Sequence, residues 1–503
     1  MLTSLLLFCN NHIKNIVIIC VFCIFTIVSM NSHANDQDTS LRLNQRLELD
    51  ANQQERQLLK DEDYLKGERP TLTIDGKTYT IHHEVNDVGR ALYLSVQKKR
   101  WSAVAYFLRE YLTFNDADPM LVSYAKGSLA RIQGDIEEAE TEFRTLLNIK
   151  PDFILGQLEL ARVLFESRKD KESEVFFHNI SKLLKSSDTR QQGVLTTVER
   201  FLQAVSQRQS WQGSIALGPT WSDNLNQTSE SYTCLYFYDN GCVYERETPS
   251  AIEAYGLGYE LSLNKRFAFS GHHGAFFRSL WFGQNYKDHA NYNESQFSTQ
   301  FGYSYHDMRN QYAIAPLFEF SRYGNNSLYG AWGLHGEWLH YLTDKIMFKV
   351  EADYKNQTYR KNSLAEQYNG NIWSGFTTAW YALPNEWMFF GGFDFSRKKA
   401  QTAQLAYRQI GVRSGLSKTI SSNINATFYA ALRKRDHDEY SPVFEQKRRD
   451  IEQSYTLIFR FPGFNLHNLE PTLTLKHRKV RSNVDWLYSH NRNSVSLKLE
   501  KKF

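Results

Sequence analysis

Alternation of apolar and polar residues recurs through the last three-fifths of this 503-residue chain and limits its fold more than any other feature. From residue 211 onward, stretches of roughly ten to fifteen residues recur about every twenty positions, each apolar on one face only. In 254–263, tyrosine and leucine alternate with glycine, glutamate and serine, and 345–355 alternates apolar with mostly charged residues. A period of two places alternate side chains on opposite faces of a strand. The segment is therefore predicted to be all-β with one apolar face.

The connections between these strands alternate in length. Tight connections occur at 307–310, 343–345, 383–385 and 462–465, and longer polar stretches lie near 225–250, 358–367, 435–447 and 480–492. A water-soluble barrel also alternates along its strands, but short turns on one rim and long loops on the other are typical of a transmembrane barrel. In lipid the sheet must close and turn its apolar face outward. The pattern predicts about fourteen antiparallel strands from Trp211 to Phe503, an even number, as in single-chain bacterial barrels.

Aromatic residues support a membrane barrel. Nine of the ten tryptophans lie at or beyond position 211. Those near predicted strand ends are expected to form girdles at the two membrane interfaces. They are Trp281, Trp338, Tyr341, Trp373, Trp380 and Trp387. The final alternation of Val495, Leu497, Leu499 and Phe503 resembles the C-terminal signal read by the barrel-assembly machinery, although Lys501 stands where an apolar residue is usual.

The N-terminal 34 residues have the layout of a secretory signal peptide. Basic residues precede an apolar run from Ile16 to Met30, and Ser32-His33-Ala34 supplies a small-x-small cleavage site. The run is shorter than the roughly 20 residues that a helical membrane span requires. Residues 35–70 form a polar arm. The expected location is the outer membrane of a Gram-negative bacterium, with a periplasmic N-terminal domain at 71–208 and the barrel at 209–503.

The periplasmic region is predicted to open with a hairpin and continue as helical repeats. Alternating residues on both sides of Asp75-Gly76 indicate a short hairpin over 71–81. Two later stretches superimpose at a 34-residue offset on the tetratricopeptide (TPR) template. The predicted packing positions are Gly127, Ala139, Phe143, Pro151, Ala161 and Phe177. A generic helical bundle is the alternative. The fold class is thus a TPR-like α-solenoid followed by a transmembrane β-barrel.

Cysteine usage predicts one disulfide. Removal of the signal peptide leaves only Cys234 and Cys242, eight positions apart in one polar stretch. In an oxidising compartment such an isolated pair suggests a small closed loop, and two unrelated thiols are the alternative. No histidine or third cysteine stands close enough in sequence to complete a zinc site.

Catalytic chemistry is not expected. The chain has no Gly-x-Ser-x-Gly elbow, no His-Glu-x-x-His pair and no phosphate-binding glycine-rich loop. His272 and His273 are adjacent, so on a strand they point to opposite faces and cannot act together. We expect neither an enzyme nor a bound cofactor or metal. The net charge of +4 makes nucleic acid an unsuitable partner.

Two groups of charged residues are candidates for roles in the barrel. Lys349, Glu351, Asp353 and Lys355 share one face of a predicted strand and are expected to line a hydrated lumen, where they could also simply pair with one another. A basic cluster at 433–435 and 447–449 flanks a predicted long loop. It could face lipopolysaccharide phosphates through charge-assisted hydrogen bonds, or form a solvated rim.

Several of these features together resemble one family, the surface lipoprotein assembly modulators, or Slam proteins, of Gram-negative bacteria. The resemblance covers about residues 70–503. It rests on the hairpin at 71–81, the segment 89–97, the Trp101 helix leading into the repeats, the first barrel strand at 213–226 and the fourteen-strand count. The strand at 213–226 is the most specific of these.

The resemblance implies a protein-transport role. The TPR domain would engage a client protein, and the barrel would act as conduit or folding template while the client crosses the outer membrane. Clients of this family are surface lipoproteins, or related secreted proteins, of the haem- or transferrin-acquisition kind. Other expected partners are outer-membrane lipid, lipopolysaccharide and the barrel-assembly machinery, with the chain itself a monomer. A TPR-barrel polysaccharide exporter and a solute porin are the alternatives.

Overall fold

The computed structural model describes residues 72–503 apart from 75–76, 80–81, 185–188, 239–240 and 465–468. The predicted signal peptide at 1–34 and the polar arm at 35–70 lie outside the described residues. The description begins with β1 (Leu72–Ile74) and β2 (Lys77–Tyr79), which pair antiparallel where the hairpin was predicted. Among the described helices, none has both the length and the apolar character of a membrane span.

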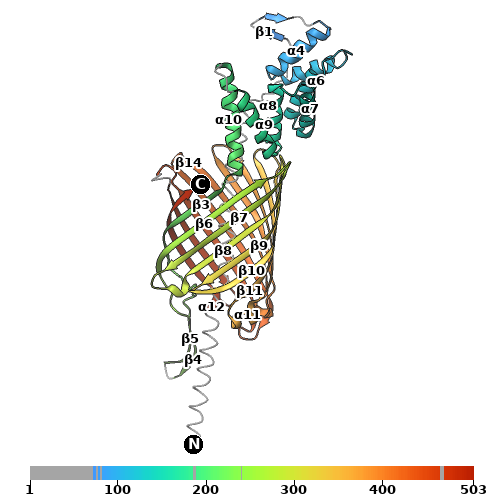
Figure 1. The fold of residues 1–503 in the computed structure, drawn as a ribbon. Coiled ribbons are helices and arrows are strands. Elements are labelled where there is room, and N and C mark those ends of the chain that lie inside the picture. Colours follow the sequence, from blue (N-terminus) through green and yellow to red (C-terminus); the bar gives the residue numbers. More distant parts are fainter. Residues whose placement is uncertain (1–71, 75–76, 80–81, 185–188, 239–240, 465–468) are drawn as a thin grey trace.

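Seven helices follow the hairpin and stack into an elongated domain beyond one rim of the barrel (Figure 1). They are α4 (Val85–Gln97), α5 (Trp101–Tyr111), α6 (Pro119–Gln133), α7 (Ile136–Ile149), α8 (Ile154–Glu166), α9 (Asp170–Leu183) and α10 (Thr189–Gln209). Helix α6 shows why the sequence sets these bounds. Asp118 accepts a hydrogen bond from the backbone N–H of Met120 at its start, and Gly134 ends it with a φ of 85°.

The predicted repeat positions lie where the helices cross. A Cβ atom added to Gly127 of α6 would lie 3.1 Å from the Phe143 ring of α7, so the small residue permits the close approach. Phe143 and Ala139 are fully buried, and so are Ala161 and Phe177 in the α8–α9 pair. Pro151 is exposed in the connection between the two pairs. The TPR-like solenoid is therefore confirmed.

The second part is a closed antiparallel barrel of fourteen strands, as the alternation predicted. Each strand pairs with its neighbours in sequence, and β18 closes the barrel against β3. The strands are β3 (Gln212–Ser222), β6 (Ala254–Ala268), β7 (His273–Tyr286), β8 (Glu294–His306), β9 (Asn310–Tyr323), β10 (Asn326–Tyr341), β11 (Ile346–Tyr359), β12 (Gly370–Leu383), β13 (Trp387–Lys398), β14 (Tyr407–Ser421), β15 (Ile424–Ser441), β16 (Gln446–Arg460), β17 (Glu470–Ser482) and β18 (His490–Lys502).

The two faces of the barrel differ in the way a lipid environment requires. Outward side chains are apolar and exposed, for example Phe393 and Trp373, whereas many lumenal ones are polar and buried. Two aromatic residues expected in the girdles are instead buried: Tyr341 and Trp380 pack with Met347 in an apolar cluster inside the barrel. Both residues lie near strand ends, as the sequence predicts, but their side chains point into the barrel and not toward the membrane.

The two rims carry different connections. The helical domain, the C-terminus and the tight connections that follow β8, β10 and β12 gather at one rim (Figure 1). The opposite rim carries the larger structures, including η2 (Ala290–Tyr292), α11 (Asn362–Tyr368), η3 (Ala403–Leu405), α12 (Asp485–Tyr488) and the hairpin of β4 (Tyr232–Tyr238) and β5 (Gly241–Glu247).

The predicted long loop at 435–447 is wrong. Strand β15 continues to Ser441 and β16 begins at Gln446, so only a four-residue turn separates them. These polar residues continue the β15–β16 ladder instead of forming a loop: Asp436 pairs with Arg449, and Tyr440 with Lys447. These charged residues form strands because they pair with opposite charges on the neighbouring strand. The polarity of either segment alone does not indicate this pairing.

Candidate functional site

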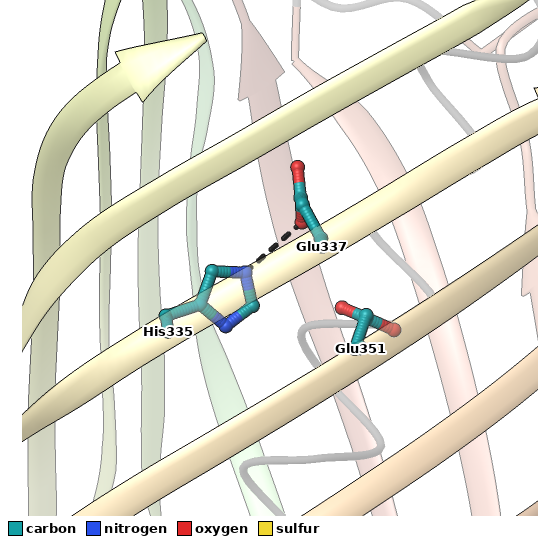
Figure 2. A group of neighbouring side chains, drawn as sticks. All are labelled: His335, Glu337 and Glu351. Atoms are coloured by element: carbon teal, nitrogen blue, oxygen red, sulfur yellow. Dashed lines mark hydrogen bonds and ion pairs between the residues drawn. The ribbon is translucent and has the colours of Figure 1, made fainter.

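A network of ion pairs on the inner face of the barrel centres on Glu337 of β10, which Figure 2 shows beside His335 and Glu351. Its carboxylate lies 2.8 Å from Nζ of Lys349 and 3.0 Å from the guanidinium of Arg278. His335 stands two residues away on the same face, with its ring nitrogen 3.1 Å from the same carboxylate. Strand register brings these groups together, because Glu337 pairs with Glu351 and Leu339 pairs with Lys349.

His335, Glu337 and Glu351 place potential ligand atoms within 4.8 Å of one another, which is close enough to consider a cation site. Their surroundings favour another role. Lys349 and Arg278 already bring positive charge to Glu337, and Asp353 lies 2.6 Å from Nδ1 of His335. A divalent cation would have to displace these charges. The arrangement fits an ion-pair network that ties β7, β10 and β11 together.

All four predicted lumen residues of β11 face the interior. Lys349 and Glu351 are buried, and Lys349 lies 3.3 Å from Glu351. Asp353 contacts His335, and Lys355 reaches across to Glu319 of β9 at 2.8 Å. The sequence-based prediction did not include Arg278, His335, Glu319 or Glu337. The same two-residue period in 326–341 could have placed His335 and Glu337 on the inward face.

A second network crosses β13 to β17 near the outer rim. Asp394 contacts Arg413 at 2.9 Å and Arg433 at 3.5 Å. Glu452 then contacts Arg433 at 3.2 Å and Arg478 at 2.7 Å. The two networks thus place oppositely charged side chains beside one another on β7, β10 and β11 and on β13 to β17.

The basic cluster at 433–435 and 447–449 is not a single surface. Because these residues lie on strands, they alternate between the two faces. Arg433, Arg435 and Arg448 are directed into the lumen, where Arg448 stacks on Tyr488 at 3.4 Å and pairs with Asp450. Lys434, Lys447 and Arg449 are exposed on the outside. Only this half of the cluster is directed away from the lumen.

The outward half joins a row of basic residues at the outer rim. Arg397 pairs with Arg408 across β13 and β14, and Asp436 stands between Arg408 and Arg449 in the same row. One row closer to the membrane, Phe395, Ile410 and Ile451 are apolar and exposed, and Lys434 stands between Ile410 and Ile451. The outer basic row therefore lies beyond a row that is mostly apolar.

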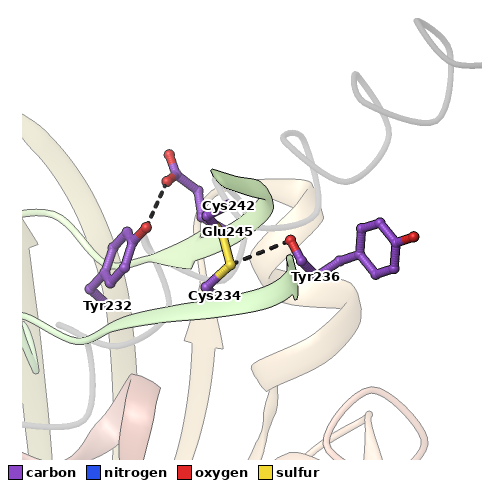
Figure 3. The surroundings of a disulfide bond; sticks show 5 residues. All are labelled: Tyr232, Cys234, Tyr236, Cys242 and Glu245. Atoms are coloured by element: carbon purple, nitrogen blue, oxygen red, sulfur yellow. Dashed lines mark hydrogen bonds between the residues drawn. A yellow bond between two sulfur atoms is a disulfide. The ribbon is translucent and has the colours of Figure 1, made fainter. Parts of the chain in front are cut away.

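The β4–β5 hairpin projects from the outer rim and contains the predicted disulfide (Figure 3). Cys234 and Cys242 are bonded, with their Cα atoms 5.8 Å apart, so this prediction is confirmed. Tyr232 donates a hydrogen bond to Glu245 across the hairpin at 3.2 Å. Tyr236 and Val243 are more than half exposed, at 58% and 63%.

The helical domain is joined to the barrel by both chain continuity and contacts. Helix α10 ends at Gln209, and β3 begins at Gln212. Asp170, at the start of α9, is 3% exposed and lies 2.6 Å from Arg208 and 3.3 Å from Arg266 of β6. The backbone N–H of Gly271 in the β6–β7 turn donates to Glu172 at 3.2 Å. These contacts hold the solenoid against the rim beside β6.

The solenoid also exposes apolar and charged groups. Tyr106, Val175 and Leu183 are more than half exposed on its helices. Glu140 lies 2.8 Å from Lys169 and 2.9 Å from Arg144. Although burial opposes its ionisation, hydrogen bonds from Lys169 and Arg144 hold the pKa of Glu140 below its usual value. Such a surface could engage another polypeptide through apolar and polar contacts.

Beside the junction where the barrel closes, the lumen contains a cavity of about 180 Å³. Its lining includes six charged residues: Glu260, Glu294, Arg460, Lys476, Lys498 and Glu500. On β3, β16, β17 and β18 most of the other lining residues are small and polar: Thr220, Thr456, Thr472, Thr474, Ser494 and Ser496. The lumen therefore has open space beside the β3–β18 junction.

The two parts of the chain match two descriptions from one family. Residues 211–503 match "Surface lipoprotein assembly modifier", and residues 74–177 match its N-terminal TPR repeats. Among solved structures, the outer-membrane channel DcaP of Acinetobacter baumannii covers 58% of this chain and 96% of its own, with 9% identity and a TM-score of 0.37.

Curated relatives match over nearly the full length. The hemophilin secretion modulator of Acinetobacter baumannii is 40% identical, covering 96% of this chain and 99% of its own. Surface lipoprotein assembly modifier 2 of Haemophilus influenzae is 24% identical, covering 85% and 86%. Together with the closed fourteen-strand barrel, these matches place the protein in the outer membrane of a Gram-negative bacterium. The chain belongs to the surface lipoprotein assembly modifier family.

Proposed function

We propose that this protein exports a client polypeptide across the outer membrane and is not an enzyme. The solenoid engages the client in the periplasm, and the barrel provides its conduit or folding template. The observation that carries the proposal is the 40% identity, over almost all of both chains, to a hemophilin secretion modulator. Because both the solenoid and the barrel are included in that match, the client class proposed is a surface lipoprotein or a secreted haem-acquisition protein.

The geometry supports this role. The solenoid is fixed at the rim by Asp170 and by the short link from α10 to β3, so a bound client is held beside the lumen. Tethering a binding surface in this way raises the local concentration of its ligand at the pore. A polysaccharide exporter or a simple porin finds no comparable support among the full-length relatives.

Two further partners belong to the proposal. The row containing Arg397, Arg408 and Arg449 lies just beyond a row that is mostly apolar, which suits the phosphates of lipopolysaccharide in the outer leaflet. The outward Val495, Leu497 and Leu499 of β18 suit recognition by the barrel-assembly machinery. The closed barrel has no strand edge that requires a second subunit, so we propose that it acts as a monomer.

Deletion of residues 70–208, with the signal peptide and barrel retained, tests the role of the solenoid. We expect the barrel to reach the outer membrane while the client stays inside the cell, because the surface that engages it is gone. Comparison of surface-shaved and secreted proteins from cells with the full chain, the truncated chain and no chain identifies the client. An unchanged set of surface and secreted proteins in cells lacking the chain contradicts the proposal.

A further inference from the structure

The junction between β3 and β18 differs from every other strand pair in the described barrel, because no turn joins its two strands. β3 is the first barrel strand and β18 the last, and the C-terminus lies beside β3 (Figure 1). All other neighbours are consecutive in the sequence of barrel strands. Backbone pairing and side-chain contacts alone hold this junction closed.

That pairing is interrupted in the middle. Residues pair from Ser494 opposite Ser222 to Ser496 opposite Thr220, and pairing resumes with Leu499 opposite Leu217. The register is the same on both sides, so the gap is no bulge. It falls at Leu497 and Lys498, which face Pro219 and Gly218.

Proline explains the gap. Gly213 and Phe503 exchange both of their backbone hydrogen bonds, at 2.9 and 3.1 Å. In an antiparallel ladder every second pair does the same, so position 219 should donate toward Leu497. Pro219 has no N–H to donate. At the adjacent position, a side chain on Gly218 would collide with the backbone oxygen of Leu497.

A similar gap occurs between β8 and β9 at Pro316. There, however, the turn Asp307–Arg309 joins the strands, and Ala315 beside the proline is fully buried. At the β3–β18 junction the pairing gap adjoins the cavity, because Thr220, Ser496 and Lys498 all line it. Among the described strand pairs, only this junction combines a pairing gap with the absence of a turn between its two strands.

A cavity of about 180 Å³ does not by itself make a continuous path for a polypeptide. An extended chain beside a strand needs a continuous path about 4.8 Å from its neighbour. Across the lumen, the ion pair of Glu337 with Lys349 connects β10 to β11, which ties that part of the wall together.

We infer that the exported client passes in extended form along the inner wall beside the β3–β18 junction, and that this junction opens to widen its path. This inference rests on the proposed function. An opened junction exposes the backbone N–H and C=O groups of β3 and β18, which can pair with an extended segment by strand addition. The threonine and serine side chains along the wall can each donate and accept a hydrogen bond to such a segment.

A reversible lock tests the opening. Ser222 and Ser494 face each other in a pair without mutual backbone bonds, because the next pair contains the bond from Asp223 N–H to the Asn493 carbonyl at 3.2 Å. Such a pair brings Cβ atoms within reach of a disulfide. We expect Ser222→Cys with Ser494→Cys to reduce client export at least tenfold when oxidised, and reducing agent to restore it.

A matched pair controls for the added disulfide. Ser374 and Ser396 of β12 and β13 also face each other inside the barrel, with hydroxyl oxygens 3.1 Å apart. Ser374→Cys with Ser396→Cys should oxidise equally well and export normally, because the turn after β12 already joins these strands. Wild-type cells treated with reductant control for loss of the Cys234–Cys242 bond. Barrel assembly is checked by the heat-dependent gel mobility of each variant.

Photo-cross-linking adds a measurement that does not depend on the lock. A photoreactive residue at Thr474, on the cavity wall, should capture the client during export, and one at Thr378, buried on the opposite side, should not. Normal export through the oxidised Ser222–Ser494 lock, an equal block by the control lock, or capture from Thr378 alone overturns the inference. Each of these leaves the proposed function intact, since that function fails only if cells lacking the chain export the client normally.

Discussion

Single residues in the lumen owe their positions to partners on distant strands. Glu337 neutralises Lys349 from the next strand and Arg278 from a strand 59 residues earlier. The alternation in 345–355 is enough to predict that Lys349 faces inward. It cannot predict Arg278 as a partner, because that contact depends on how far each strand is displaced along its neighbours. The sequence therefore predicts which side chains point into the lumen, but not which of them contact one another.

Replacing Glu337 with glutamine should destabilise the barrel by about 3 kcal/mol, because Lys349 and Arg278 lose a charged partner in a buried setting. The temperature at which the folded band converts to the unfolded band in gel electrophoresis measures this loss. Glu439→Gln, at an exposed position on the outer rim, is the matched control and should leave that temperature unchanged. Equal shifts in both variants would contradict the importance of the network.

Glu140 gives the solenoid a pH-dependent contribution. Its pKa is lowered in the folded protein, so the stabilisation is complete above the unfolded value of 4.5 and is lost as pH falls through the lower folded value. Glu140→Gln should cost about 1 kcal/mol at neutral pH, given partial solvent screening. Hydrogen exchange of α7 and α9 in the full-length protein should show this difference at pH 7 and a smaller one at pH 3. A difference that grows on acidification would refute the sign.

At the scale of elements, the sequence revealed strands and repeats better than the ends of strands. Gly127, Phe143 and Phe177 lie where the repeat template placed them, since helix crossing requires those sizes at those positions. The polarity of 435–447 predicts a loop, but its charged residues pair across a hairpin with residues of the neighbouring strand, and neither side alone indicates this. The sequence around the two cysteines likewise predicts a polar loop and does not indicate the β4–β5 hairpin.

Removing the disulfide should loosen that hairpin without affecting the barrel. Cys234→Ser with Cys242→Ser deletes a short closed loop, and the expected loss of hairpin stability is about 2 kcal/mol. Protease added to intact cells should then cut within 232–247 faster than in the wild type, because this hairpin lies at the outer rim. Heat-dependent gel mobility should not change. A barrel that fails to assemble would show that the bond has a wider role.

At the scale of the whole molecule, the order of the two domains was predictable, but their contact was not. The change of period near residue 210 marks where helix gives way to strand. Nothing in that change indicates that Asp170 meets Arg266 across 96 positions. Side-chain contacts between domains depend on the angle at which one rests on the other, and that angle is a property of the assembled chain.

Asp170→Asn should loosen the solenoid from the rim while both domains stay folded, because Arg208 and Arg266 lose the carboxylate that they share. Hydrogen exchange should rise in the β6–β7 turn and at the start of α9, and barrel melting should stay the same. Asp152→Asn, in an exposed connection, is the control. Unchanged exchange in the turn would show that the link from α10 to β3 alone fixes the domain.

That link has a mechanical consequence. Only Ser210 and Trp211 separate the last turn of α10 from β3, so a tilt of the solenoid pulls directly on β3. No turn joins β3 to its neighbour β18. If one tilt of the solenoid favours a wider junction, a ligand that selects this tilt favours widening, and by reciprocity a widened junction strengthens that ligand's binding. Binding of the ligand by the solenoid and widening of the β3–β18 junction would then be one coupled equilibrium, with no need for a separate signal between them.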